Sequence, residues 1–189
     1  MPAETGSSRS SGQPPAPRWA HFARDVIAAT ACGRAVQEVD AGGLAAAPHG
    51  GVFVTLYKFR RLRGCMGVLD TALPLPEAVR QAAVCAARHD PRFEPVGPGE
   101  LRDLEIEVSV MSAPRLLAGL DELELGVHGI LVRRGRCRGL FLPQVAVEHH
   151  LGKEEFLSRC CAEKAGLPTD AWRDPQTEVL VFTTEVFRE

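Results

Sequence analysis

The pattern of hydrophobic and polar positions predicts a chain in which helices and strands alternate irregularly. Apolar residues recur between Trp19 and Thr30 at the spacing of one helix face, and the following Gly42-Gly43 pair predicts that this helix ends near Asp40. A second helix is predicted from Pro76 to Ala87, because the fixed φ of proline suits the first helical position.

Strands are predicted where β-branched, aromatic or alternating apolar residues occur. They cover residues 52–59, 62–70, 104–111 and 178–187, with a hairpin formed by 128–134 and 138–142. One further helix is predicted to begin at Pro143 and end at Gly152, and another to run from Phe156 to the stop signal at Gly166. Hairpins outnumber βαβ units in this order, which favours an α+β architecture.

Length and composition then narrow the class of protein. The chain has 189 residues and a formal charge of 22 − 24 = −2, with 45% hydrophobic residues, as in ordinary globular proteins. No apolar run reaches the roughly 18 residues that span a bilayer, so no membrane segment is expected. The charge disfavours nucleic-acid binding, which usually needs a basic surface. Residues 1–17, rich in Ser, Pro and Gly, are predicted to be a disordered tail before a folded unit at 18–189.

Six cysteines raise the question of disulfides. Residues 1–17 contain no apolar segment of the secretory type, and three cysteines fall within apolar helical patterns. Reduced thiols and a cytoplasmic location are therefore expected.

The segment Arg63-Gly64-Cys65-Met66-Gly67 is the strongest candidate for chemistry. Two glycines leave little side-chain bulk around the thiol of Cys65, and nearby arginines favour the thiolate, the form that acts as nucleophile or metal ligand. The alternative is a core cysteine in a strand whose glycines mark a bulge.

A nucleophilic thiol also needs a base and an orienting group. His128 stands at a predicted strand start, while Glu107 and Ser109 share one face of their strand. His128 and Glu107 are therefore the candidate base or orienting group. Each also has an ordinary structural interpretation, His128 as a satisfied polar residue and Glu107 as a solvent-facing one.

Other chemistry has weaker support. The sequence contains no spaced Cys or His pairs of the metal-binding type, no Walker loop and no G-x-G-x-x-G, so no metal site and no nucleotide motif are predicted. The four arginines in residues 133–138 could bind RNA, although a charged hairpin tip of this kind is usually a solvated turn. Gln144, near the start of a helix at Pro143, could contact an anion.

Several short stretches together resemble one family. Leu62-Arg63-Gly64-Cys65-Met66-Gly67 is similar to the Leu-Arg-Gly-Cys-Ile-Gly signature of the AMMECR domain family, whose bacterial and archaeal members are called AmmeMemoRadiSam system protein A. Further matching stretches are Asp90-Pro91-Arg92-Phe93, Glu105 to Val110, Gly126 to Ile130, Leu142 to Ala146 and the pattern from Glu155 to Trp172. The resemblance runs in order from about Arg18 to the C-terminus.

The resemblance implies an α+β fold of two unequal lobes around a cleft, with the Arg-Gly-Cys stretch near that cleft. It does not define a reaction, a substrate or a cofactor. Family members are often encoded beside a Memo-like protein and a radical SAM protein, which suggests these as partners by association.

Three hypotheses follow from these observations. The first is an enzyme, or a component of an enzyme system, centred on Cys65. Its candidate substrate-binding residues are Arg63, Gly64, Gly67, Asp90, Arg92, Ser109 and Gln144. The second is a non-catalytic module that docks a Memo-like or radical SAM partner. The third is an RNA-binding protein.

Overall fold

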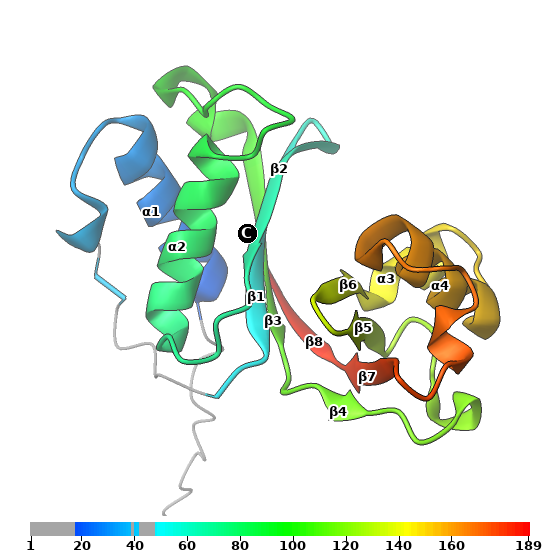
Figure 1. The fold of residues 1–189 in the computed structure, drawn as a ribbon. Helices are drawn as coiled ribbons and strands as arrows, with labels where there is room; N and C mark the ends of the chain where they lie inside the picture. The colour runs from blue at the N-terminus through cyan, green and yellow to red at the C-terminus, as the bar shows by residue number, and fades with distance from the viewer. Residues whose placement is uncertain (1–17, 39, 42–47) are drawn as a thin grey trace, which may run out of the picture.

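The computed structural model describes residues 18–38, 40–41 and 48–189 and contains two lobes, each built on a four-stranded antiparallel sheet (Figure 1). The predicted tail 1–17 and the Gly42-Gly43 pair lie outside the described residues. The α-helices are α1 (Trp19–Ala31), α2 (Leu75–Arg88), α3 (Pro143–Glu148) and α4 (Lys153–Arg159). The π-helix η4 (Cys160–Ala165) continues α4. Short 3-10 helices are η1 (Val36–Glu38), η2 (Pro98–Asp103), η3 (Leu120–Glu122) and η5 (Ala171–Arg173). These elements confirm the predicted α+β class.

The first lobe is a sheet, here called sheet A, with two helices on one face. Its strand order is β2 (Arg61–Val68), β1 (Gly51–Lys58), β3 (Leu104–Met111) and β8 (Thr184–Arg188). Alternate apolar residues of β1 and β3 point toward α1 and α2 and form the core of this lobe. The buried face of α2 is rich in alanine, which allows the helix to lie close to the sheet. The second lobe lies on the other side of sheet A (Figure 1).

The first helix is shorter than the sequence pattern predicts. It ends at Ala31 rather than near Asp40, and Gly33 follows in the left-handed conformation at φ 67°. Glycine adopts this conformation at little cost, so it commonly terminates helices. The stop signal is Gly33, and the apolar pattern beyond it forms only the short turn η1.

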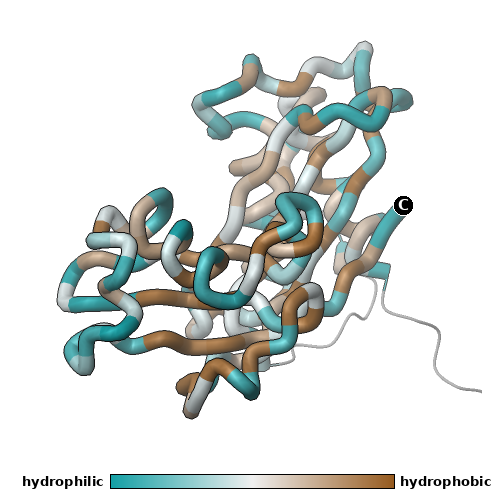
Figure 2. Tube along the Cα trace, turned by 90° about the vertical axis from the view of Figure 1, so that its right-hand side faces the viewer, coloured by the Kyte–Doolittle hydropathy of each residue, from teal (hydrophilic) through white to brown (hydrophobic). Residues whose placement is uncertain are grey.

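The second lobe packs short helices against sheet B. The strand order is β4 (Arg115–Leu116), β7 (Glu178–Phe182), β5 (Gly129–Arg134) and β6 (Cys137–Phe141). Phe141 of β6 stacks on Phe156 of α4 with ring centroids 5.6 Å apart. A Cβ on Gly139 would lie 2.4 Å from the Ala165 nitrogen, so this glycine lets η4 approach the strand backbone. Figure 2 shows hydrophobic residues along the strands of this lobe and hydrophilic ones at its outer turns.

Two chain crossings join the lobes. The predicted single strand at 178–187 is instead two strands, β7 in sheet B and β8 in sheet A, separated by Thr183. The chain from β3 to β4 crosses beside it, and the Ser112 nitrogen donates to the Thr183 carbonyl at 2.9 Å while the Thr183 nitrogen donates to Ser112 Oγ at 3.0 Å. A sequence pattern cannot show this division, because both halves continue the same alternation of apolar residues. Among the described residues, no helix is long and apolar enough to cross a membrane.

Candidate functional site

Cys65 lies on the face of sheet A that α1 and α2 leave uncovered, which we call the polar face. Thr55 pairs with Cys65 on one side and with Glu107 on the other, and Glu107 pairs in turn with Arg188. Residues directly opposite one another in antiparallel strands point to the same side of the sheet. Cys65, Thr55, Glu107 and Arg188 therefore form one polar row across four strands, with neighbours about 4.8 Å apart.

The thiol of Cys65 is half-buried, and its Sγ atom lies 3.2 Å from Oγ1 of Thr55. Either atom can be the donor in this contact. The backbones of Glu107 and Cys65 are two strand spacings apart, roughly 10 Å, with Thr55 between them. The Glu107 carboxylate accepts a hydrogen bond from Nε of Arg188 at 2.8 Å.

The backbone of Cys65 is held at the free edge of β2 by two side chains from the loop after α2. The Cys65 nitrogen donates to Oδ2 of Asp90 at 2.8 Å, and Arg92 Nη2 donates to the Cys65 carbonyl at 3.2 Å. Arg92 also donates from Nε and Nη2 to Asp90, at 2.9 and 2.7 Å. Asp90 and Arg92 thus occupy the groups that an unprotected edge strand would offer to another chain.

The electrostatics of this loop favour a charged Asp90. Its side chain is 2% exposed, and hydrogen bonds from Arg92, followed by those from the backbone of Cys65 and Arg92, hold its pKa well below the usual range despite burial. The carboxylate satisfies two backbone nitrogens and one guanidinium. Asp90 and Arg92 are predicted from the sequence to bind substrate. In the structure, both contact the backbone of Cys65 and so help to position it.

Arg63 lies beside this loop and forms an ion pair. Its Nε and Nη2 donate to Glu100 at 3.0 and 2.8 Å, and Lys58 Nζ donates to the same carboxylate at 3.1 Å. These bonds lower the pKa of Glu100 to about 2, with the Arg63 hydrogen bond as the largest cause. The Arg63 guanidinium also lies 6.0 Å from the centre of the Phe93 ring. Two of its donor groups, Nε and Nη2, are therefore engaged by Glu100 in this structure.

The two glycines that flank Cys65 are required by packing. A Cβ on Gly64 would lie 2.5 Å from the Ala86 carbonyl oxygen of α2, on the helix side of the sheet. A Cβ on Gly67 would lie 2.3 Å from the ring of Phe53, which covers it. The sequence-based idea that these glycines leave space at the thiol does not describe their surroundings, since helix backbone and an aromatic ring fill that space.

A shallow pocket of about 330 Å³ lies along the polar face beside the row, lined by Tyr57, Arg60, Glu105, Glu107 and Arg188. Burial raises the pKa of the Tyr57 phenol, and the negative charges of Glu107 and Glu148 raise it further. Glu148 ends α3 of the second lobe. The negative charge of Glu148 therefore acts on Tyr57 from the second lobe.

The remaining candidates lie near this region or in the second lobe. Ser109 is buried on the polar face, in register with Phe53 and two residues from Glu107. His128 precedes β5, and its Nδ1 accepts a hydrogen bond from the Glu124 nitrogen at 3.1 Å. Gln144 lies in the first turn of α3. Among the described residues, no hydrogen bond joins His128 or Gln144 directly to Cys65, so their roles at the thiol stay predictions.

Sequence reasoning missed Thr55, Tyr57 and Arg188. Thr55 and Tyr57 alternate with the buried Val54 and Leu56, so the period-two pattern of β1 could have indicated them. Arg188 carries no such signal, because its neighbour Glu107 is known only once β8 is placed beside β3.

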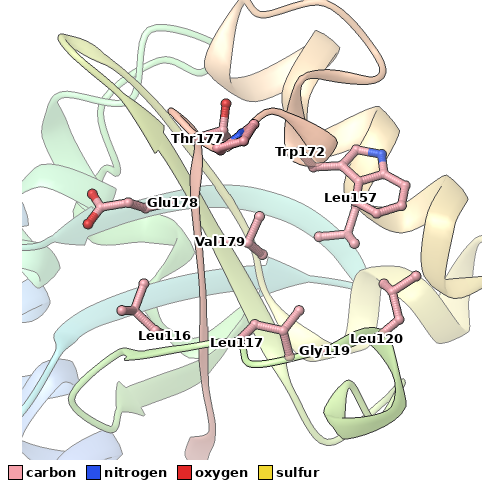
Figure 3. A pocket seen from close by; sticks show the side chains of 10 residues that line it. Leu116, Leu117, Gly119, Leu120, Leu157, Trp172, Thr177, Glu178 and Val179 are labelled. Carbon is pink, nitrogen blue, oxygen red and sulfur yellow. The ribbon is translucent and has the colours of Figure 1, made fainter.

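The second lobe contains an apolar groove of about 420 Å³ (Figure 3). We call it the apolar groove; its side chains include Leu116, Leu117, Leu120, Leu157, Trp172 and Val179. Leu116 is 61% exposed at its edge. The groove borders the second core, and Thr177 and Glu178 add polar groups to its lining.

The arginine-rich hairpin tip is partly neutralised. Arg133 pairs with Glu178, and Arg134 pairs with Asp174 at 2.9 Å. These ion pairs halve the positive charge that the four arginines could present to a phosphate backbone.

All six cysteines are free, which agrees with the predicted reduced thiols. Burial raises the pKa of Cys160 to about 12. Cys32 and Cys137 are exposed. Over the described residues, no group of three or more His, Cys, Asp or Glu side chains is arranged to hold a metal ion.

The fold and the polar face define a two-lobed α+β protein, and comparisons with known proteins place the chain in a family. The AMMECR1 family model matches residues 20–187. The chain therefore belongs to the AMMECR1 family, as the sequence resemblance predicts.

Relatives and a solved structure support this assignment. A protein of Methanothermobacter thermautotrophicus is 48% identical over 145 residues, covering 74% of this chain and 75% of the relative. A protein of Methanopyrus kandleri is 47% identical over 148 residues, covering 74% and 71%. The crystal structure of an uncharacterized protein from Pyrococcus horikoshii matches with a TM-score of 0.80 and 37% identity, over 92% of this chain and 90% of that one.

Proposed function

We propose that the polar face of sheet A is the binding site for a small polar ligand and that Cys65 is its reactive group. In this proposal the chain is an enzyme, or a component of an enzyme system, that acts in the reducing cytoplasm. The observation that carries it is the register of Cys65, Thr55, Glu107 and Arg188, which aligns a thiol, a hydroxyl, a carboxylate and a guanidinium on one side of the sheet.

The support for Cys65 is its fixed position. Its backbone nitrogen and carbonyl are held by Asp90 and Arg92, so the thiol is presented on the polar face from a strand edge that cannot shift freely. A site built on a rigid strand places its reacting atom more accurately than one on a loop. Thr55, at 3.2 Å, can donate to a thiolate or accept from a thiol.

The roles of Glu107 and His128 follow from their distances and partners. Thr55 lies between Glu107 and Cys65, and Glu107 pairs with Arg188, so we assign Glu107 to contact the ligand or to exchange a proton with it. His128 stays a candidate that would have to reach the ligand from the second lobe. Arg63 supports the site through Glu100, while Asp90 and Arg92 are positioning residues.

The test is alkylation of the intact protein with iodoacetamide over a range of pH values, with each cysteine followed by peptide mass spectrometry. We expect Cys65 to react faster than the exposed Cys137 at about pH 7, because a functional thiol is activated by its surroundings. Cys137 serves as the ordinary exposed thiol and Cys160 as the buried, inert one. A Cys65 rate at or below that of Cys137 throughout this range contradicts the proposal.

A docking module is the second candidate function, and the apolar groove beside the exposed Leu116 favours it. Such a groove can receive an apolar side chain from a partner. The proposed partners are a Memo-like protein and a radical SAM protein. Co-purification of these proteins with the tagged chain, lost in Leu116→Lys and kept in Arg138→Gln, would support this function. Absence of co-purification with either protein would count against it.

A further inference from the structure

The pocket beside the polar row carries both signs of charge in a small space. Tyr57 and Glu105 are directly opposite each other on β1 and β3, and Glu107 lies two residues further along β3. Arg188 comes from β8, and Arg60 from the turn between β1 and β2. The volume of about 330 Å³ is at the lower end of the range for small-molecule sites.

The Glu107–Arg188 pair leaves hydrogen-bonding capacity for a ligand. Glu107 has a side chain only 10% exposed, and it uses Oε2 to accept from Nε of Arg188. The Arg188 side chain is 74% exposed, so its two Nη groups can reach a second carboxylate without breaking this pair. Arg188 is therefore held to Glu107 through Nε, while its two Nη groups stay available to a ligand.

At the rim of the pocket, Glu105 adds an acidic side chain and Arg60 a basic one. Within the described residues, the side chains of Glu105 and Arg60 form no ion pair. Glu148 of the second lobe contributes a further negative charge near Tyr57. A ligand with a single negative charge would leave these carboxylates facing it, and one with a single positive charge would face two guanidinium groups.

We infer that this pocket binds a small zwitterion of the amino-acid or dipeptide class, with its carboxylate on Arg188 and its ammonium group on Glu105. Tyr57 lies directly opposite Glu105 on β1, at the ammonium end of the ligand, where its hydroxyl can hydrogen-bond the ligand. This inference rests on the proposed function, because it names the ligand class of the same site. It extends that function by placing the ligand at the Arg188 end of the row, so that a substituent can extend toward Cys65.

Three matched probes separate the charges: glycylglycine, which carries both, N-acetylglycylglycine, which carries only the anion, and glycylglycinamide, which carries only the cation. Binding to the full chain is followed by two-dimensional NMR of backbone amides. We expect glycylglycine to shift the amides of Tyr57, Glu107 and Arg188, and each blocked probe to bind at least about tenfold more weakly.

Variants locate the two charges. Arg188→Gln and Glu105→Gln are both at exposed side chains, so they should fold, and each should weaken glycylglycine binding about tenfold. Arg133→Gln is the control, because Arg133 is an exposed arginine of the second lobe that pairs with Glu178. Its binding should equal that of the unchanged chain.

The outcomes distinguish this inference from the proposed function. Equal binding of a blocked probe, shifts confined to residues outside the pocket, or no binding of glycylglycine up to about 20 mM overturns the zwitterion assignment. Fast alkylation of Cys65 in the same preparation would then leave the proposed function standing. Slow alkylation of Cys65 together with specific glycylglycine binding would instead keep the ligand class and remove the reactive thiol.

Discussion

The two faces of sheet A differ in what their residues do. On one face, Val54 and Leu56 of β1 are fully buried against α1 and α2, where each apolar side chain adds roughly 1.5–3 kcal/mol to stability. On the other face, Thr55 and Tyr57 of the same strand stand beside Cys65 and Glu107. One strand thus supplies the core with its even positions and the candidate site with its odd positions. The comparison teaches that substitutions one residue apart should have separable effects.

The largest effect is expected from the helix side. Leu56→Ala removes a fully buried side chain and leaves a cavity, so it should lower the free energy of unfolding by about 2–5 kcal/mol. Urea denaturation measures this change. In the fraction that stays folded, Cys65 should keep its alkylation rate relative to Cys137. A loss of stability below about 1 kcal/mol would mean that the core of this lobe is not where the structure places it.

Asp90→Ala should have the next largest effect, because it leaves the Cys65 nitrogen and the Arg92 guanidinium without their acceptor. We expect a loss of about 2 kcal/mol in the free energy of unfolding. The matched control is Glu163→Ala, which removes an exposed ion pair with Arg159 and should change stability by less than about 0.5 kcal/mol. Equal effects of the two substitutions would contradict the positioning role of Asp90.

Acid titration tests the cluster that anchors Arg63. The folded-state pKa of Glu100 is lowered from 4.5 to about 2, so its contribution is present above pH 4.5 and is lost as the pH falls toward 2. The free energy of unfolding should therefore decrease over this window. Glu100→Gln should be less stable at neutral pH by roughly 1–3 kcal/mol and should show a shallower decrease in acid. An unchanged slope in the variant would show that Glu100 titrates normally.

The smallest stability change is expected on the polar face. Thr55→Val keeps the shape of the side chain and removes the hydroxyl that contacts Cys65, so stability should change by less than about 1.5 kcal/mol. The rate of Cys65 alkylation should fall by a factor of about 3–10, because a hydroxyl that donates to the thiolate stabilises it. Ser109→Ala is the control on the same face and should leave that rate unchanged. Equal rates in both variants would remove Thr55 from the site.

Much of the fold could be predicted from the sequence because its strands follow a clear period of two. The pattern at 104–111 gave the bounds of β3, since a strand with one buried face alternates along its length. The split between β7 and β8 could not be predicted, because it depends on the hydrogen bonds of Thr183 with Ser112, which is distant in sequence. The early end of α1 could have been predicted from Gly33.

The candidate site was predictable only in part. Cys65 is conspicuous because of its glycines and arginines, although the structure assigns those neighbours to packing and to Glu100. Glu107 was found from strand alternation, whereas Arg188 depends on the pairing of β8 with β3. A row that runs across strands joins residues far apart in the chain, so local sequence patterns do not reveal it.

The most direct test of the central claim is the alkylation rate of Cys65 measured with and without glycylglycine. If the polar face is a ligand site centred on this thiol, Cys65 should react faster than Cys137, and glycylglycine should change the Cys65 rate alone. Arg188→Gln should abolish that change. The account would be contradicted if Cys65 reacted no faster than Cys137 and its rate did not change with glycylglycine. The polar row would then be ordinary sheet surface.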